Sequence, residues 1–290
     1  MKSIKLFANI ISILLVAFQF TFTSCSKEND ICNVSVISKE GGVAVSTENE
    51  VAPGSNVILT ATPNEGYEFL NWTIKGEIVS ADNPYTVNIT KNSRFEANFI
   101  KISNVVENPE SEDGHYYVDL GLSVKWATCN IGANEPQEYG DYFSWGETEP
   151  KLIYTSATYA YRSSPLTSSL SEEEDAAHIV WGGSWRMPTV DEFDELRDAR
   201  NCAWVWSSQN GVKGYKVISL KESTKGRYIF LPAAGYYNNQ NLCYDGSDGL
   251  YWSASFAKKS WAFGLNFGKS YKDGDYYNCF FGSSIRPVHP

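Results

Sequence analysis

The sequence predicts an α+β protein, in which a small all-β module precedes a larger domain of few helices and many short strands. Two patterns predict this fold class. Residues 33–101 alternate apolar and polar positions in short runs between turn residues, as half-buried β-strands do. Residues 190–200 instead repeat apolar side chains at helical spacing, and further strand-like runs follow. An apolar N-terminal segment precedes both parts and indicates export.

The N-terminal segment has the three parts of a secretory signal. Lys2 and Lys5 supply the positive start, residues 6–22 are almost wholly apolar, and small residues precede Cys25. A membrane-spanning helix is the alternative, since the apolar run is near the lower length limit for a span. This alternative is disfavoured because polar and acidic residues follow Cys25, in place of a positively charged flank. Residues 1–24 are therefore predicted to be a signal peptide.

The residues Phe22-Thr-Ser-Cys25 resemble a lipobox, in which a signal peptidase cuts just before a diacylated cysteine. The resemblance implies that the mature chain begins at a lipidated Cys25 and that residues 25–32 tether it to a membrane. Acyl chains anchor strongly, at about 0.8 kcal/mol per buried methylene. Residues 26–30 are polar and partly acidic, and they resemble the export tags of Bacteroidetes lipoproteins. This second resemblance implies a position on the outer membrane, at the cell surface.

The composition is acidic and rich in aromatic residues. The chain has 24 Lys and Arg against 34 Asp and Glu, a net charge of −10, which becomes −12 once Lys2 and Lys5 leave with the signal peptide. Such a chain repels phosphate backbones, so nucleic acid is not expected as a partner. Nine Trp and 14% aromatic residues predict either a Trp-rich core or exposed stacking platforms, and a core usually takes most of such rings.

Residues 33–101 are predicted to form a small antiparallel β-sheet. Turn signals such as Gly41-Gly42 interrupt the alternating runs, and no helical periodicity occurs. The segments 54–63, 66–73 and 95–99 resemble the divergent internalin B-repeat family, whose members are small β modules of surface proteins that usually serve as spacers. The aromatic residues expected in the core are Tyr67, Phe69, Trp72, Phe95 and Phe99.

A polar, acidic linker and a second domain are predicted after this module. The linker is 102–113 and the domain is 114–290. The clearest helix of the domain is assigned to 190–200, because Thr189 and Glu192 form a capping box ahead of its apolar repeat. A less regular helix is expected at 171–180, and the expected strands are 215–218, 227–231, 251–254 and 261–267.

Six ordered phrases of the second domain resemble the Fibrobacter succinogenes major paralogous domain, which is abundant in Bacteroidetes surface lipoproteins. Residues 186–193 also resemble a signature of formylglycine-generating enzyme relatives. Those relatives have a C-type-lectin-like fold, which implies few helices, a twisted antiparallel sheet and long loops. The six phrases are 117–130, 140–147, 185–189, 230–235, 251–255 and 284–288.

Five cysteines follow the lipidated one. An oxidising compartment permits disulfides, but an odd number leaves at least one thiol free or paired outside the chain. We favour bridges between Cys129 and Cys202 and between Cys243 and Cys279, because Cys32 lies in the other domain. No CxxC motif occurs, so neither a thioredoxin-like site nor a zinc ribbon is expected.

No catalytic residue and no metal ligand is predicted. Formylglycine-generating enzymes hold copper with closely spaced cysteines, whereas Cys243 and Cys279 lie far apart in the sequence. His115 and His289 are expected to be solvated, and His178 is expected to be structural. No GxSxG, HExxH or phosphate loop occurs, and nothing singles out a glycosidase pair among the carboxylates.

A binding role fits the sequence better than catalysis. The loop 235–241 combines tyrosine rings with amide side chains, which grip sugars through an aromatic face and directed hydrogen bonds. We predict a surface binding or adhesion module for carbohydrate or glycoprotein. The alternatives are a non-catalytic structural component of a surface assembly and, less favoured, a glycan-processing enzyme. The candidate ligand-binding residues are Tyr236, Tyr237, Asn238, Asn239 and Gln240.

Calcium is a weakly supported cofactor, and no other cofactor is expected. The turns 245–249 and 273–275 are rich in Asp and Gly and could present oxygen atoms to a hard cation. Short Asp-Gly clusters are, however, usually ordinary turns.

Overall fold

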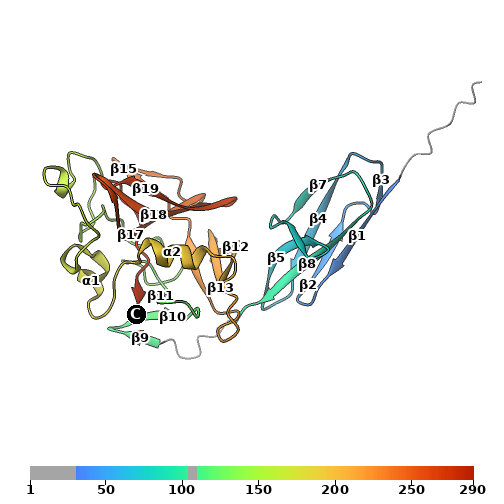
Figure 1. The fold of residues 1–290 in the computed structure, drawn as a ribbon, viewed down its shortest axis with the longest axis horizontal. Coiled ribbons are helices and arrows are strands. Elements are labelled where there is room, and N and C mark those ends of the chain that lie inside the picture. The colour runs from blue at the N-terminus through green and yellow to red at the C-terminus, as the bar shows by residue number, and fades with distance from the viewer. Residues whose placement is uncertain (1–30, 104–109) are drawn as a thin grey trace, which may run out of the picture.

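The computed structural model describes residues 31–103 and 110–290, which form two β-rich domains side by side (Figure 1). The predicted signal peptide, 1–24, and Cys25 lie outside these described residues. None of the helices in the described ranges has the length and hydropathy that a membrane span requires.

The predicted α+β fold class is wrong, because the protein is mostly β. The described residues contain two short α-helices, α1 (Ala176–Trp181) and α2 (Val190–Arg197), beside many strands divided among several small sheets. The C-type-lectin-like architecture that the resemblance implied is also wrong, because the strands form several small sheets. Apolar side chains at helical spacing are confined to these two segments, and the aromatic-rich remainder pairs as strands because pleated sheets accommodate such rings well.

The smaller domain is the all-β module that its alternating pattern predicts. It has a five-stranded sheet in the order β3-β1-β8-β5-β6 and a three-stranded sheet in the order β2-β4-β7. The expected antiparallel pairing is wrong at one place, since β1 runs parallel to β8. The strands are β1 (Cys32–Ser38), β2 (Gly42–Ser46), β3 (Glu50–Val51), β4 (Ser55–Pro63), β5 (Tyr67–Ile74), β6 (Glu77–Ser80), β7 (Tyr85–Ile89) and β8 (Ser93–Lys101).

Residues of both sheets make the core of the smaller domain. Phe69, Trp72 and Phe95 are buried as predicted, and Phe99 packs against them. Tyr67 is the exception, because its ring covers Gly41 at the edge of the module. A Cβ at Gly41 would lie 2.3 Å from Cδ1 of Tyr67, so the close approach requires glycine.

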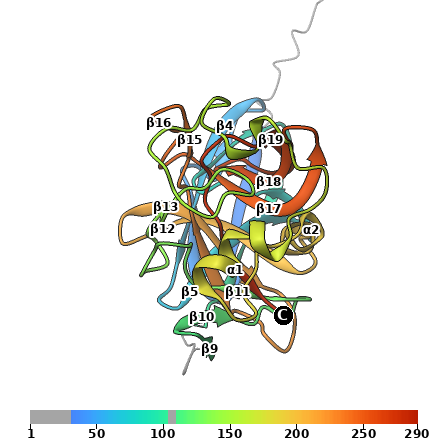
Figure 2. The ribbon, with the colours of Figure 1, turned by 90° about the vertical axis from the view of Figure 1, so that its left-hand side faces the viewer.

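Four small sheets and long loops build the larger domain. Figures 1 and 2 show the strands β15 to β19 on one side of this domain and β9 to β11 on the opposite side. The sheet orders are β20-β11-β10-β9, β12-β13-β14, β15-β16 and β17-β18-β19. The strands are β9 (Glu110–Glu112), β10 (His115–Val118), β11 (Lys125–Ala127), β12 (Cys202–Gln209), β13 (Val212–Ser219), β14 (Tyr228–Pro232), β15 (Tyr236–Asn238), β16 (Asn241–Cys243), β17 (Asp248–Lys258), β18 (Trp261–Gly268), β19 (Tyr271–Asn278) and β20 (Val288–His289).

The two predicted helices are present but shorter than expected. The capping box of α2 is confirmed, since the Thr189 side chain accepts from the Glu192 amide and Glu192 accepts from the Thr189 amide. Helix α2 ends at Arg197 rather than at residue 200, because Asp198 adopts an extended backbone. The less regular segment divides into a 3₁₀ turn, Glu172–Glu174, and the short helix α1. A further 3₁₀ turn spans Ala160–Arg162.

Tryptophans fill the core of the larger domain, as predicted. The indole N–H of Trp145 donates to the Ser253 carbonyl and that of Trp252 donates to the Phe143 carbonyl, each at 2.8 Å. These rings therefore join loops to the sheet that contains β17 and do not form exposed stacking platforms. Trp126, Trp145, Trp185 and Trp252 are fully buried.

Arg286 is also fully buried, and no carboxylate of residues 31–103 or 110–290 forms an ion pair with it. Its Nε donates to Oδ1 of Asn130 at 2.8 Å, and its Nη2 donates to the Phe230 carbonyl at 2.9 Å. Its Nη1 donates to the carbonyls of Ala127 and Thr128 at 3.1 and 3.0 Å. Burial lowers the pKa of this guanidinium, because it disfavours the charged form. The four oxygens that accept from the guanidinium offset the loss of water around the charge.

The two domains meet at a small apolar cluster and an ion pair. Ile100 and Ile102 of the smaller domain pack with Ala203 and Ile218 of the larger one. The Lys216 ammonium pairs with the Glu68 carboxylate across the same contact. The first residue of the predicted linker is thus part of the contact between the domains.

We expect Arg286→Met to lower the free energy of unfolding by at least about 3 kcal/mol, because each buried acceptor left without a donor costs roughly 1–3 kcal/mol. Urea unfolding followed by Trp fluorescence measures the change. Arg200→Met is the control, since Arg200 is exposed and its partner among the described residues is the nearby Asp198. The unfolding midpoint of this variant should not move. An Arg286→Met midpoint equal to that of the parent protein would contradict the structural role of Arg286.

Candidate functional site

The predicted ligand loop is a β-hairpin, in which β15 pairs with β16 through the turn at Asn239 and Gln240. Successive side chains of a strand point to opposite faces, so Tyr236 and Tyr237 cannot serve the same surface. Asn238 is partly buried, whereas Asn239 and Gln240 are exposed at the turn. The structure therefore separates the five predicted residues instead of bringing them into one site.

Tyr237 is part of the packing beneath the hairpin. Its ring stacks on Tyr154 with centroids 5.5 Å apart and meets the Tyr142 ring edge-on at 4.9 Å. The backbone of Asn239 exchanges two hydrogen bonds of 2.9 Å with the backbone of Tyr154. Tyr237 and the Asn239 backbone therefore attach the hairpin to the loop that contains Tyr154.

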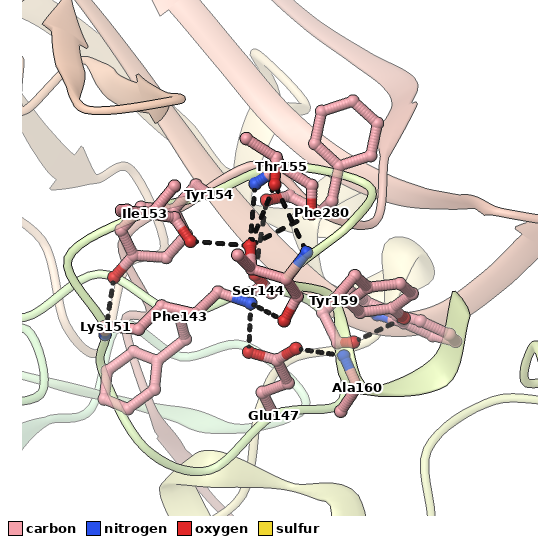
Figure 3. Close-up of polar contacts among 12 residues, drawn as sticks. Phe143, Ser144, Glu147, Lys151, Ile153, Tyr154, Thr155, Tyr159, Ala160 and Phe280 are labelled. Atoms are coloured by element: carbon pink, nitrogen blue, oxygen red, sulfur yellow. Dashed lines mark hydrogen bonds and ion pairs between the residues drawn. The ribbon is translucent and has the colours of Figure 1, made fainter. Parts of the chain in front are cut away.

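That supporting loop is held by a dense network of polar contacts (Figure 3). Glu147 accepts from the Ala160 amide at 2.7 Å and pairs with the Lys151 ammonium at 2.6 Å. The Tyr154 hydroxyl donates to the Tyr142 carbonyl at 2.5 Å. Because its charged and hydroxyl groups already bind one another, we interpret this loop as a scaffold for the hairpin and not as a reactive centre.

The other face of the hairpin opens onto a hollow of about 310 Å³. Of the five predicted ligand-binding residues, Tyr236 lines this hollow. Its ring stacks on Tyr244 with centroids 5.9 Å apart. We call this recess the tyrosine hollow. It is lined by Tyr236, Tyr244, Asp248, Gly249, Leu250, Asn266, Tyr271 and Tyr277.

Gly268 of β18 makes room for the ring of Tyr271. Gly268 pairs with Asp248 of β17 on one side and with Tyr271 of β19 on the other. A Cβ at Gly268 would lie 2.5 Å from Cε1 of Tyr271 and 2.6 Å from Oδ1 of Asp248. Glycine at 268 therefore lets the Tyr271 ring lie across the strand and beside the Asp248 carboxylate.

The polar groups of the tyrosine hollow are partly desolvated. The Tyr271 hydroxyl donates to Oδ1 of Asn266 at 3.1 Å, and burial together with the Asp248 charge raises the pKa of Tyr271 to about 12. Burial likewise raises the pKa of Asp248, and hydrogen bonding with Tyr271 opposes this rise. Burial also raises the pKa of Tyr236. The hollow thus presents tyrosine hydroxyls, one carboxyl group and one amide to a ligand.

Sequence reasoning found Tyr236 and missed the other residues of the hollow. The sequence did contain one indication of these residues. Tyr271 and Tyr277 are an even number of positions apart, so they lie on the same face of a strand in which tyrosines are the apolar residues. This indication could not be used because three strands and the hairpin supply the lining, and the sequence does not predict which of them become neighbours.

The aspartates of the two Asp-Gly turns lie in different surroundings, and calcium binding stays a prediction. Asp248 belongs to the tyrosine hollow, and Asp273 and Asp275 lie on the exposed strand β19. Within residues 31–103 and 110–290, no three His, Cys, Asp or Glu side chains are grouped so that they could hold a metal ion.

The histidines belong to the packing at the opposite side of the domain. His115 stacks on Trp181 with centroids 3.8 Å apart, and burial lowers its pKa. His289 pairs with Glu112 and stacks on Tyr117 at 4.8 Å. The expectation that both side chains would be solvated is therefore wrong.

A recess of about 420 Å³ beside α1 includes His178. Its carboxylate Asp175 accepts from the amides of Ala177, His178 and Met187 and so caps the helix. The Asp175 carboxylate is therefore committed to backbone donors, and the other titratable side chains of the recess are Glu172, His178 and Arg186.

All five described cysteines are free thiols. Cys202 packs in β12 with the core around Trp126, whereas Cys279 packs in a second cluster around Trp145. Burial raises the pKa of each of these two thiols to about 12. Neither predicted bridge, Cys129 to Cys202 or Cys243 to Cys279, is formed in the structure, and the pairing stays a prediction for the oxidised protein.

Residues 32–103 match the family described as the divergent InlB B-repeat domain. The resemblance predicted for the smaller domain is therefore confirmed. No curated protein and no solved structure is significantly similar to the chain.

We expect Tyr271→Phe to raise the pKa of Asp248 further above its ordinary value of 3.8, because the neighbouring Tyr271 hydroxyl, which lowers this pKa against the effect of burial, is removed. Carboxyl ¹³C NMR across an acid titration measures it. Tyr276→Phe is the control, since Tyr276 points away from the hollow and packs against Trp261. An Asp248 titration curve that does not move in Tyr271→Phe would contradict the contact.

Proposed function

We propose that this protein is a lipid-anchored cell-surface protein whose larger domain binds carbohydrate or the glycan of a glycoprotein. The observation that supports the proposal is the tyrosine hollow, where four tyrosines surround Asp248 and Asn266. Sugars combine apolar C–H faces with hydroxyl edges, so aromatic rings beside a carboxylate and an amide are complementary to them. The volume of about 310 Å³ suits a short stretch of a glycan.

Neutral side chains dominate the hollow, and this favours binding over catalysis. Asp248 is its one acid, whereas glycoside hydrolysis ordinarily needs two carboxyl groups that face each other across the bond. Burial raises the pKa of Tyr236 and Tyr277, and burial together with the Asp248 charge raises the pKa of Tyr271 to about 12. These hydroxyls are therefore hydrogen-bonding groups for a ligand rather than bases.

The proposed location rests on the N-terminal sequence. A lipidated Cys25 would attach the chain to the outer membrane, and the acidic residues behind it would direct it to the cell surface. The six phrases of residues 114–290 support a domain of the Fibrobacter major paralogous kind, without the lectin-like fold. In this arrangement the B-repeat domain is the spacer that holds the larger domain away from the membrane.

We expect the protein to bind neutral glycans on a glycan array, and Tyr236→Ala to weaken the binding about tenfold, because one aromatic face is lost. Isothermal calorimetry with the best array glycan measures the loss. Tyr116→Ala is the matched control: Tyr116 is 49% exposed on β10, on the opposite side of the domain, and its loss should change nothing. Absence of any array binding, with and without calcium, would favour a structural component of a surface assembly.

We also expect Cys25→Ser to abolish lipidation, because the thiol that receives the acyl chain is removed. Cells labelled with radioactive palmitate should yield a labelled parent protein and an unlabelled variant, and the variant should leave the membrane fraction. Cys32→Ser is the control, since Cys32 is a buried residue of β1 and the label should persist. Label retained in Cys25→Ser would refute the anchor.

A further inference from the structure

A further recess, of about 620 Å³, lies between the two domains. Figure 1 shows the strands that supply its walls, with β5 on one side and β12 and β13 on the other. We call it the interdomain cleft. The smaller domain contributes β5 and the loop 81–83, and the larger domain contributes β12, β13 and the turn from β18 to β19. The cleft is separate from the tyrosine hollow except at Tyr271, which lines both.

Close contacts hold the two walls of the cleft together. The Glu68 carboxylate on β5 pairs with the Lys216 ammonium on β13. In a separate contact between the domains, the Gly226 carbonyl accepts from the Ser103 amide at 2.9 Å. A Cβ at Gly226 would lie 2.6 Å from the Lys101 carbonyl, so the approach of the two backbones requires glycine. The width of the cleft is thus set by packing between the domains.

The rim of the cleft is also fixed from each side. In the larger domain, the Tyr215 hydroxyl donates to the carbonyls of Gly268 and Lys269 at 3.0 Å, which ties the turn between β18 and β19 to β13. In the smaller domain, the Asn83 amide donates to the Ala61 carbonyl at 2.7 Å, and Asp82 accepts through its carbonyl from Trp72 at 3.0 Å. Both rims are therefore ordered before any ligand binds.

The charge of the cleft is opposite to that of the protein. Lys213, Lys269 and Lys272 line it, and none of these ammonium groups is within ion-pair distance of a carboxylate of the described residues. Of the two acids in the lining, Glu68 is already paired with Lys216, which leaves Asp82. An excess of unpaired positive charge in a chain with a net charge of −10 marks a local site for an anion.

The positive charges are crowded. Lys272 is partly buried, and its pKa is lowered first by burial and then by the neighbouring charge of Arg197. Arg197 itself pairs with Asp194, and Asp273 lies beside Lys272 in β19. An anionic group bound in the cleft would offset the repulsion between these cations.

An aromatic floor accompanies the lysines. Trp206 of β12 packs edge-on against Tyr215 with centroids 5.0 Å apart, and Trp204 meets the same ring at 5.2 Å. The Trp204 indole N–H is used by the Leu196 carbonyl at 2.9 Å. The Trp206 indole N–H has no partner among the described residues and is only partly buried. Trp206 thus offers a ring face and a donor to a ligand.

We propose that the interdomain cleft binds an acidic polysaccharide, whose carboxylate or sulfate groups lie against Lys213, Lys269 and Lys272 while a sugar ring rests on Trp206. This inference rests on the proposed function in one respect, since both assume that the ligand is a carbohydrate. Since the cleft needs both domains, the B-repeat domain is part of the binding surface as well as a spacer.

Binding of polymers to the full mature chain tests this proposal. The probes are polygalacturonate against fully methyl-esterified polygalacturonate, and dextran sulfate against dextran, so that each pair differs in charge on one backbone. We expect at least one anionic polymer to bind about tenfold or more tightly than its neutral partner, and the preference to shrink as salt rises. The two pairs distinguish a carboxylate from a sulfate ligand.

The triple variant Lys213→Gln, Lys269→Gln, Lys272→Gln should lose this preference, with binding of the anionic polymer weakened about tenfold, because three positive charges are removed. The matched control changes three exposed lysines outside the cleft, Lys75, Lys91 and Lys259, to Gln, and it should keep the preference. The melting temperature of both variants checks that they fold. Arginine at the three cleft positions should preserve binding.

Several outcomes overturn the inference. It is overturned if neither anionic polymer binds more tightly than its neutral partner, or if the cleft variant and the control variant bind alike. The Tyr236→Ala variant separates it from the proposed function. If anionic binding depends on the three lysines while no neutral glycan binds, the proposed glycan site at the tyrosine hollow is refuted and the proposed site in the cleft is supported. If neutral glycans bind at Tyr236 and charged polymers bind no more tightly, the proposed site in the cleft is refuted and the one at the tyrosine hollow is supported.

Discussion

The Arg286 guanidinium connects parts of the larger domain that no single sheet joins. Its four hydrogen bonds reach β11, the residues after it and the strand β14, while its own segment leads into the C-terminal strand β20. With sheets of two to four strands, the domain lacks a continuous ladder to organise its loops. A buried cation that makes four hydrogen bonds to oxygen atoms provides that organisation, because any rearrangement would leave the charge unsolvated.

Order around Arg286 extends outward to the tyrosine hollow. The Asn130 amide, whose oxygen accepts from Arg286, also lies 3.3 Å from the Tyr251 hydroxyl, and Tyr251 belongs to β17. Strand β17 in turn places Asp248 beside Tyr271. On the other side, the loop of Figure 3 holds Tyr154 against the hairpin and so sets the position of Tyr236. Rigid placement matters for a binding site, because rings that are already ordered lose little entropy when a ligand arrives.

The two recesses differ in charge but share one strand end. Tyr271 begins β19, with its ring in the tyrosine hollow and its neighbours Lys269 and Lys272 in the interdomain cleft. A polymer long enough to pass this residue could contact both recesses, so the turn between β18 and β19 is the junction of the proposed binding surface. The Tyr215 hydroxyl that fixes this turn therefore supports both sites.

The sequence by itself determined the local features of this protein. The period of two in the smaller domain, the capping box at Thr189 and the buried tryptophans follow from side-chain spacing and burial, which depend on near neighbours in the chain. Helix α2 ended early and the α+β class was wrong because tertiary pairing, not propensity, decides how aromatic-rich segments are used. Only the tertiary structure decided which face of β15 belongs to a site and which segments complete it. Tyr236 and Tyr271 are far apart in the sequence, and their contact with one hollow depends on strand order that no local pattern encodes.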